Sequence, residues 1–118
     1  MPEPEENPPT PVGQMFGDFA PALVEFTDET LFGQVWTRPE LSLRDRSLVT
    51  VACLVANGNT TQLVGHLTRA KNNGVTEAEL IEAITHLAFY AGWPRAMSAM
   101  AVAKEVFGEI QDTGGDKS

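Results

Sequence analysis

Residues 46–94 read RSLVTVACLVANGNTTQLVGHLTRAKNNGVTEAELIEAITHLAFYAGWP, and this stretch decides the fold. Apolar residues recur in it at helical spacing, and Gly, Asn and Pro residues fall between the apolar runs. The chain has no segment with the sustained alternation of apolar and polar residues that is typical of a half-buried β-strand. The sequence therefore predicts an all-α protein.

Capping residues set the limits of the helices in this stretch. Ser42 with Asp45 three residues later is a weaker form of the capping box, and Thr76 with Glu79 is a proper one. Asn59 or Thr60 is the N-cap of the helix between them. Asn57-Gly58 ends the helix that begins at Ser42, and Asn73-Gly74 ends the next one. Five helices are predicted, over about residues 21–35, 42–56, 60–72, 76–92 and 94–108.

The ends of the chain differ from its middle in composition. Residues 1–14 begin with MPEPEENPPTP, which is too rich in Pro and Glu to bury enough apolar surface to offset the entropy of ordering it. Residues 111–118 are similarly polar. A chain of 118 residues has room for one ordinary core. We expect a single helical domain over residues 15–110, with a flexible tail on each side.

Charge and cysteine usage narrow the class of protein. The net charge of −8 argues against a nucleic-acid partner, which requires clustered Lys and Arg. No apolar run approaches the roughly 20 residues of a membrane span, and the acidic N-terminus does not resemble a signal peptide. A single cysteine, Cys53, fits a reducing compartment. We expect a cytoplasmic protein without a nucleic-acid or membrane partner.

Residues 48–55 make the second helix apolar around most of its circumference, so it is predicted to be the central, buried helix. Its one less apolar stripe consists of Arg46, Thr50, Cys53 and Asn57. Polar groups inside a core need partners or a ligand. Thr50 is expected to bond to its own helix and Asn57 to cap it. For Arg46, pairing with a carboxylate and binding a ligand are both open.

His66 is the sharper candidate for chemistry. It lies three or four residues from Leu63 and Ala70 on the packed face of its predicted helix, so it points inward or to the rim of a pocket. A half-buried imidazole can exchange a proton near neutral pH. A core histidine bonded to a backbone carbonyl is the more common explanation of such a position, and periodicity does not decide between the two interpretations.

Other polar and aromatic residues carry weaker signals. His86 sits beside the apolar arc of its helix with Glu82, which an exposed pair one turn apart explains. Phe89, Tyr90 and Trp93 cluster at the end of this helix, as pocket walls or as plain core or subunit contacts, and Trp36 has the same ambiguity. No spacing typical of metal ligands, phosphate loops or dinucleotide sites occurs, so no metal or other cofactor is expected.

Several separated motifs follow one another over about residues 32–107. They are Trp36-Thr37-Arg38-Pro39-Glu40-Leu41, Arg44-Asp45-Arg46-Ser47-Leu48-Val49-Thr50, Gln62-Leu63-Val64-Gly65-His66, Asn73-Gly74-Val75-Thr76 and Tyr90-Ala91-Gly92-Trp93-Pro94. These motifs and their order resemble those of the carboxymuconolactone decarboxylase family.

The resemblance implies a domain of five to six antiparallel helices, similar to the alkylhydroperoxidase D proteins, in a ring-shaped homo-oligomer. A hexamer built as a trimer of dimers, or a trimer, is common in such proteins, and their pockets lie between subunits. Thiol peroxidases of the same superfamily carry a Cys-x-x-Cys pair before the histidine. The corresponding positions here are Asn59 and Gln62, so the resemblance favours the decarboxylase branch.

The family reaction removes a carboxylate from a lactone without a cofactor. By motif, His66 is implied as the proton donor or oxyanion stabiliser, and Arg46 as a catalytic partner that binds a substrate carboxylate. Trp36, Cys53, Tyr90 and Trp93 are implied as substrate-binding residues. Glu29 is also expected among the substrate-binding residues, and Glu29 or Glu25 is a guess from position for the carboxylate that orients His66.

The leading hypothesis is a cofactor-independent decarboxylase acting on a small lactone or cyclic carboxylic acid. A second hypothesis is a non-catalytic oligomer that binds a metabolite or a partner protein. A third is a one-cysteine peroxide reductase that uses Cys53, which unchanged peroxide handling in Cys53→Ser would exclude.

Overall fold

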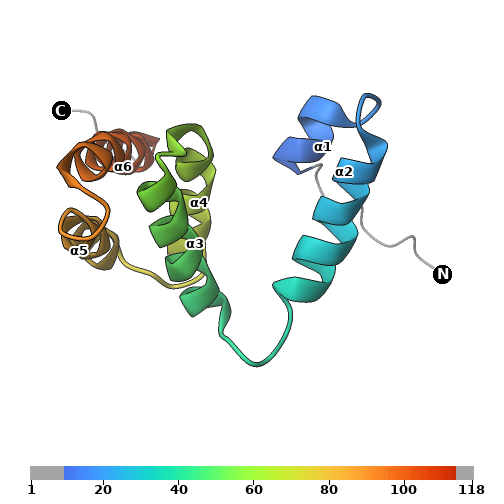
Figure 1. Cartoon of the computed structure of the whole chain (residues 1–118), viewed down its shortest axis with the longest axis horizontal. Coiled ribbons are helices and arrows are strands. Elements are labelled where there is room, and N and C mark those ends of the chain that lie inside the picture. The colour runs from blue at the N-terminus through green and yellow to red at the C-terminus, as the bar shows by residue number, and fades with distance from the viewer. Residues whose placement is uncertain (1–9, 114–118) are drawn as a thin grey trace. The chain divides into compact units, whose positions relative to one another are not determined.

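Helices dominate the part of the chain that the structure describes, in agreement with the predicted all-α class (Figure 1). The computed structural model describes the backbone of residues 10–113 and the side chains of residues 10–108. Within that range there are six α-helices, one π-helix and no strand. The chain divides between Glu40 and Leu41 into two compact units. A single domain over residues 15–110 stays a prediction.

The first unit begins with two short helices, α1 (Pro11–Phe16) and α2 (Pro21–Glu25), each with proline in its first turn. Thr10 is the N-cap of α1 and accepts a hydrogen bond from the Gly13 N–H at 3.0 Å. Its hydroxyl also donates to Asp28 at 2.9 Å. These contacts make residues 11–14 helical, although the sequence analysis assigned them to a flexible tail. The rest of that tail, residues 1–9, lies outside the described residues.

A π-helix, η1 (Phe26–Val35), continues directly from α2. The single helix predicted over residues 21–35 is therefore wrong in type for its last 10 residues. The wider turn of η1 is seen where the Trp36 N–H donates to the Leu31 carbonyl, five residues back, at 2.9 Å. The spacing of five between Phe26 and Leu31 suits this wider turn better than an α-helix.

The second unit starts with a helical hairpin of α3 (Leu43–Asn57) and α4 (Thr60–Asn72). The Ser42 side chain accepts from the Asp45 N–H, as predicted, and α3 ends at Gly58 in the left-handed conformation with φ of 74°. Asn59 takes the N-cap position of α4 without a side-chain cap bond. At the other end of the hairpin, Asn73 donates to the buried Ser47 hydroxyl at 2.9 Å.

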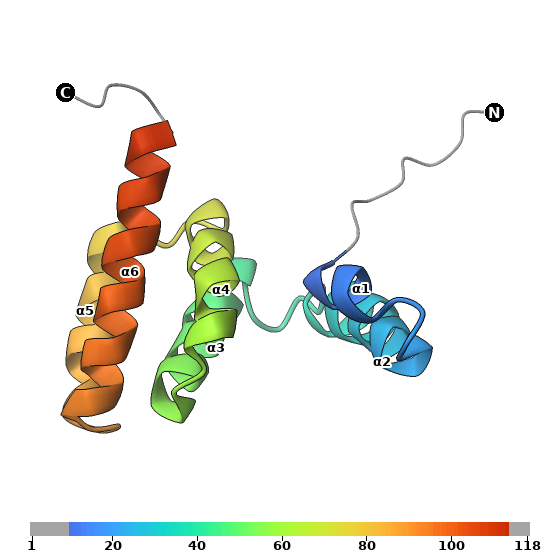
Figure 2. The same cartoon turned by 90° about the horizontal axis from the view of Figure 1, so that it is seen from above.

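The remaining helices are α5 (Glu77–Leu87) and α6 (Trp93–Thr113), which lie side by side (Figure 2). The predicted capping box of Thr76 and Glu79 is present at the start of α5. The predicted end near Gly92 is wrong, because α5 stops at Leu87 and tight turns fill residues 88–91. Helix α6 passes the predicted end at residue 108 and takes in residues 111–113 of the expected tail. Residues 114–118 lie outside the described residues.

The core of the second unit is formed where α3, α4, α5 and α6 meet. Helix α3 contributes only one buried face, made by Ser47, Val51 and Val55. The prediction of a central helix buried all round is wrong, because Val49 on another face is 61% exposed. The fully enclosed apolar side chains come from all parts of the bundle. They include Val51, Val55, Leu63, Leu67, Ala70, Val75, Leu80, Ile84, Ala99 and Ala103.

None of the helices in residues 10–113 combines the length and the apolar character needed to cross a bilayer.

Candidate functional site

His66 lies in the middle of α4, on the edge of its buried face. The neighbouring Leu63, Leu67 and Ala70 are completely buried, whereas His66 is half-buried. The Nδ1 atom of its ring is shielded from solvent. The half-burial of His66 agrees with the expectation that it points inward, and a pocket at its position stays a prediction.

Burial, followed by the positive charge of Arg69, lowers the pKa of His66 from its ordinary value. Arg69 is one turn further along α4 and is also half-buried. The imidazole is consequently neutral at neutral pH, and in this form one ring nitrogen donates a hydrogen bond while the other accepts. The sequence analysis missed Arg69, although its spacing of three from His66 on one helix was a usable signal.

The charge around His66 differs from that of the chain as a whole. Residues 46–76 contain Arg46, Arg69 and Lys71 and no Asp or Glu, in a chain whose net charge is −8. Lys71 forms an ion pair with Glu77 at the start of α5. Arg44, in the first turn of α3, forms ion pairs with Asp45 and Glu79. Arg46 and Arg69 are the other cations of the α3–α4 hairpin.

Arg46, the other predicted catalytic residue, lies in the first turn of α3 and is half-buried. Its Nε atom is shielded from solvent. The Thr50 hydroxyl donates to the Arg46 carbonyl at 2.8 Å, which confirms the expectation that Thr50 bonds to its own helix. Arg46 and His66 come from the two arms of the same hairpin, and their joint action on a ligand stays a prediction.

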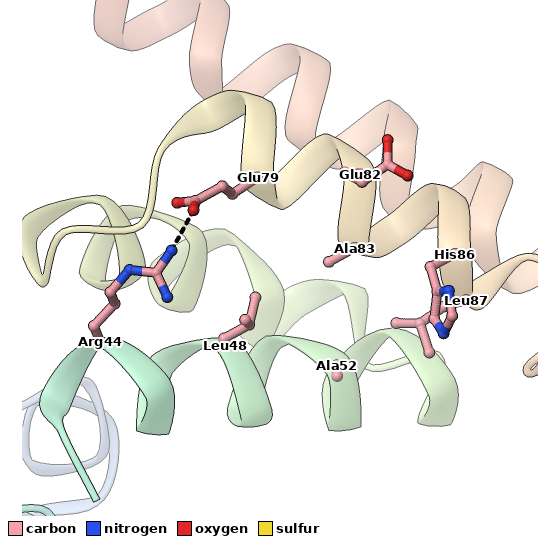
Figure 3. Close-up of a pocket in the computed structure, with 8 residues that line it drawn as sticks. All are labelled: Arg44, Leu48, Ala52, Glu79, Glu82, Ala83, His86 and Leu87. Atoms are coloured by element: carbon pink, nitrogen blue, oxygen red, sulfur yellow. Dashed lines mark hydrogen bonds and ion pairs between the residues drawn. The ribbon is translucent and has the colours of Figure 1, made fainter.

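A groove of about 410 Å³ runs between α3 and α5 (Figure 3). Its floor is apolar, and an ion pair between Arg44 and Glu79 lies at one end, with His86 at the other. The His86 ring is stacked on Tyr90, with 4.9 Å between centroids. The sequence analysis missed this groove, because it treated Arg44 and Glu79 only as motif and capping residues. Its lining consists of Arg44, Leu48, Ala52, Glu79, Glu82, Ala83, His86 and Leu87.

The groove is poorly suited to a carboxylic acid. Glu79 and Glu82 place two carboxylates along it against the single guanidinium of Arg44. A hydrogen bond from the Thr76 N–H and then the contact with Arg44 lower the pKa of Glu79, so this carboxylate is charged at neutral pH. These two carboxylates would repel an anionic ligand.

Three further residues predicted to bind substrate belong to the second unit, and all three are exposed. Cys53 lies on an exposed face of α3, not inside a core as its stripe suggested, and its sulfur accepts from the Asn57 amide at 3.4 Å. Tyr90 stacks on His86, and Trp93 packs edge-on against Phe89 with centroids 5.3 Å apart. Their role as substrate-binding residues stays a prediction.

Trp36 and Glu29, the other two residues predicted to bind substrate, belong to the first unit. Trp36 follows η1, is 7% exposed and stacks on Phe32 with 5.8 Å between centroids. Glu29 is exposed on η1. An arrangement of either residue with His66 stays a prediction.

Within residues 10–113, no three His, Cys, Asp or Glu side chains come together in a group that could hold a metal ion.

Comparison with known proteins agrees with the motifs. The sequence profile of the Carboxymuconolactone decarboxylase family matches residues 21–105. A 4-carboxymuconolactone decarboxylase of Acinetobacter baylyi is 44% identical over 93 residues, which cover 79% of this chain and 69% of the relative. The nitrosuccinic acid decarboxylase npaB of Metarhizium robertsii is 38% identical over 90 residues, which cover 76% of this chain and 63% of the relative.

Proposed function

The chain belongs to the carboxymuconolactone decarboxylase family, and we propose that this carboxy-lyase acts without a cofactor on a small lactone or cyclic carboxylic acid. The observation that carries the proposal is the 44% identity to a 4-carboxymuconolactone decarboxylase over 79% of the chain. His66 and its motif lie inside the matched residues.

The names of the two relatives indicate what their substrates share. Loss of CO2 leaves an electron pair on carbon, and a neighbouring group must accept it. In an unsaturated lactone the ring alkene and carbonyl accept the pair as a dienolate, and in a nitro acid the nitro group accepts it as a nitronate. A protein that stabilises the resulting negative oxygen lowers the barrier to either reaction. An acyclic nitro acid is therefore a second candidate substrate, supported by the 38% identity to npaB.

His66 is assigned to the oxygen that becomes negative. Because burial and Arg69 lower its pKa, its imidazole is neutral at neutral pH and donates a hydrogen bond through one N–H. A neutral imidazole can donate a hydrogen bond to the oxyanion. A general acid, in contrast, would have to be protonated to imidazolium before the reaction. The proton would then be drawn from water, and it would be added to a different carbon in the dienolate and to the carbon that lost CO2 in the nitronate.

Arg46 and Arg69 are assigned to substrate carboxylates. A guanidinium holds a carboxylate by two parallel hydrogen bonds, and the hairpin that carries both arginines has no Asp or Glu in residues 46–76. The carboxylate that leaves must lose its charge, so an arginine bound to it would oppose the reaction. The arginines are therefore expected to hold the second carboxylate of the substrate, which keeps its charge.

We further propose that the working form is a homo-oligomer, as a trimer or as a hexamer of three dimers, with Trp36, Cys53, Tyr90 and Trp93 as substrate-binding residues and Glu29 as the group that orients His66. The exposure of Tyr90 and Trp93 supports a role at a surface that another subunit covers. Light scattering that returned 12.8 kDa would contradict the oligomer.

A substrate panel tests the proposed function. The purified full chain is mixed with γ-carboxymuconolactone, with nitrosuccinic acid and with saturated analogues that lack an electron acceptor. Release of CO2 and the proton NMR spectrum of each mixture are followed. Turnover of an unsaturated or nitro acid, without turnover of the saturated analogues, is expected. A folded, fully assembled protein that acts on none of them would favour the alternative of a non-catalytic binding protein.

A further inference from the structure

Two Asn-Gly pairs end the arms of the α3–α4 hairpin, and they allow a direct comparison. Asn57 is the last residue of α3 and precedes Gly58, and Asn73 follows α4 and precedes Gly74. Both glycines adopt the left-handed conformation, with φ of 74° and 101°. Each glycine N–H donates to a carbonyl three residues back at 3.1 Å. The backbone surroundings of the two asparagines are therefore closely similar.

An asparagine that precedes a glycine can be converted in water without an enzyme. The backbone nitrogen of the glycine loses its proton and attacks the Cγ atom of the asparagine side chain. A new N–Cγ bond closes a succinimide ring, the bond from Cγ to the side-chain nitrogen breaks, and the nitrogen leaves as ammonia. Water then opens the ring to an aspartate or an isoaspartate. Glycine permits this attack best, because it has no β-carbon to hinder the approach.

The side chains of the two asparagines are held very differently. The Asn73 amide donates to the Ser47 hydroxyl at 2.9 Å, and Ser47 is 1% exposed. The Asn57 amide contacts the sulfur of the exposed Cys53 at 3.4 Å, and a thiol sulfur is a weak acceptor. Rotation of the Asn57 side chain toward the Gly58 nitrogen therefore costs less than the same rotation at Asn73, which breaks a buried hydrogen bond.

Asn57 also lies where its helix opens most easily. Residues 56–59 are all exposed, and the end of a helix opens locally at a lower cost than its interior. The attack requires the Gly58 N–H to leave the Val55 carbonyl, and opening of the last turn of α3 releases it. The Arg95 side chain lies against Gly58, and its positive charge favours the negative nitrogen that attacks.

We propose that Asn57 is a site of spontaneous deamidation, and that the buried bond to Ser47 protects Asn73 from the same reaction. The product is a carboxylate at the C-terminal end of α3, where the negative end of the helix dipole opposes it. An isoaspartate also lengthens the backbone just before the left-handed turn at Gly58. The modification therefore loosens the turn between the two arms of the hairpin, and it does so whether or not the chain is a decarboxylase.

Peptide mapping of the full chain by mass spectrometry tests the proposal, because the reaction replaces an NH2 group by an OH group of different mass. The folded protein is incubated at mildly alkaline pH, and conversion at each asparagine is followed over time. Asn57 is expected to convert at least about 10-fold faster than Asn73, the factor that corresponds to about 1.4 kcal/mol for one buried hydrogen bond. Asn59, which is exposed but precedes Thr60, is the internal control and is expected to convert more slowly than Asn57.

Three further samples connect the difference to the structure. In urea, Asn57 and Asn73 are expected to convert at similar rates, because the unfolded chain lacks the bond to Ser47. In Ser47→Ala, shown to be folded by far-ultraviolet circular dichroism, conversion at Asn73 is expected to rise toward that at Asn57. Asn57→Gln assigns the fast reaction, because a glutamine side chain closes such a ring far more slowly.

Equal rates at Asn57 and Asn73 in the folded wild type would overturn the proposal, as would faster conversion at Asn73. An Asn57 that converts in urea but not in the folded chain would overturn it too. Unchanged conversion at Asn73 in folded Ser47→Ala would contradict the protection by Ser47. If Ser47→Ala does not fold, the comparison of the two asparagines within the wild type still decides, and none of these readouts depends on turnover.

Discussion

Burial lowers the pKa of His66, and Arg69, one turn further along α4, adds to this shift with its positive charge. The two residues therefore act together, because burial of the ring and then the charge of the arginine both favour the neutral imidazole. The sequence motif names the histidine alone.

Removing this arginine should change the titration of its neighbour. In Arg69→Gln the pKa of His66 is expected to rise, because one of the two causes of its depression is gone. Proton NMR titration of the ring signals measures this, and His86→Gln assigns the second histidine. Lys104→Gln, which removes a cation from α6, is the control, and the pKa of His66 is expected to be unchanged in it. An unchanged pKa in Arg69→Gln would contradict the pairing.

The lowered pKa of His66 also makes stability depend on pH. Below about pH 6.5 the unfolded chain takes up a proton on this histidine, while the folded chain resists it until the pH reaches the lowered pKa. The free energy of unfolding should therefore fall as the pH falls from about 6.5 to the lowered pKa of His66. Below that pKa, this histidine should not lower the free energy further. Urea unfolding of wild type and His66→Gln across this pH range measures it. The wild type should show the steeper dependence, and equal slopes would argue against the depressed pKa.

The link between Ser47 and Asn73 is expected to stabilise the hairpin of α3 and α4. Ser47 is 1% exposed, and its hydroxyl accepts from the Asn73 amide at 2.9 Å. Ser47→Ala should cost about 1–2 kcal/mol, because the half-buried amide then loses its acceptor. Chemical denaturation gives the value. Ser98→Ala at an exposed position on α6 serves as the control, and a loss no larger than in this control would show that the bond contributes little.

Two glycines should respond in opposite directions to the same substitution. Gly58 has φ of 74°, and a β-carbon there would collide with the Arg95 side chain. Gly58→Ala should therefore destabilise by about 1–2 kcal/mol or more. Gly65 lies inside α4 with open space around the position of a β-carbon, so Gly65→Ala should stabilise by about 0.5–1 kcal/mol. Thermal unfolding of both variants checks the pair, and a loss of stability in Gly65→Ala would count against the described surroundings of α4.

Local signals predicted the helix starts well, and burial patterns were predicted less well. Ser42 with Asp45 and Thr76 with Glu79 act within one turn, so the sequence contains the whole interaction. Burial of α3 depends on which neighbours cover it, and Val49 shows that an apolar residue on an apolar helix can stay exposed. The π-helix was not predicted, because an α-helical period was assumed across Phe26 and Leu31.

For the candidate site too, the sequence predicted some features and not others. His66 could be named from its motif and its place beside Leu63 and Ala70, and its half-burial agrees with that interpretation. The pKa shift required knowledge of how deeply the ring lies and of the charge beside it. The groove that joins Arg44 to His86 brings together residues more than 40 positions apart, so helical periodicity alone contained no sign of it.

The central claim is that His66, and not the groove histidine His86, acts on the substrate. The most direct measurement is the rate of CO2 release from γ-carboxymuconolactone by wild type, His66→Ala and His86→Ala, each at a matched oligomeric state. We predict a loss of at least about 100-fold in His66→Ala and a rate close to that of the wild type in His86→Ala. Full activity in His66→Ala, or loss of activity in His86→Ala alone, would contradict the account and place the reaction in the groove between α3 and α5.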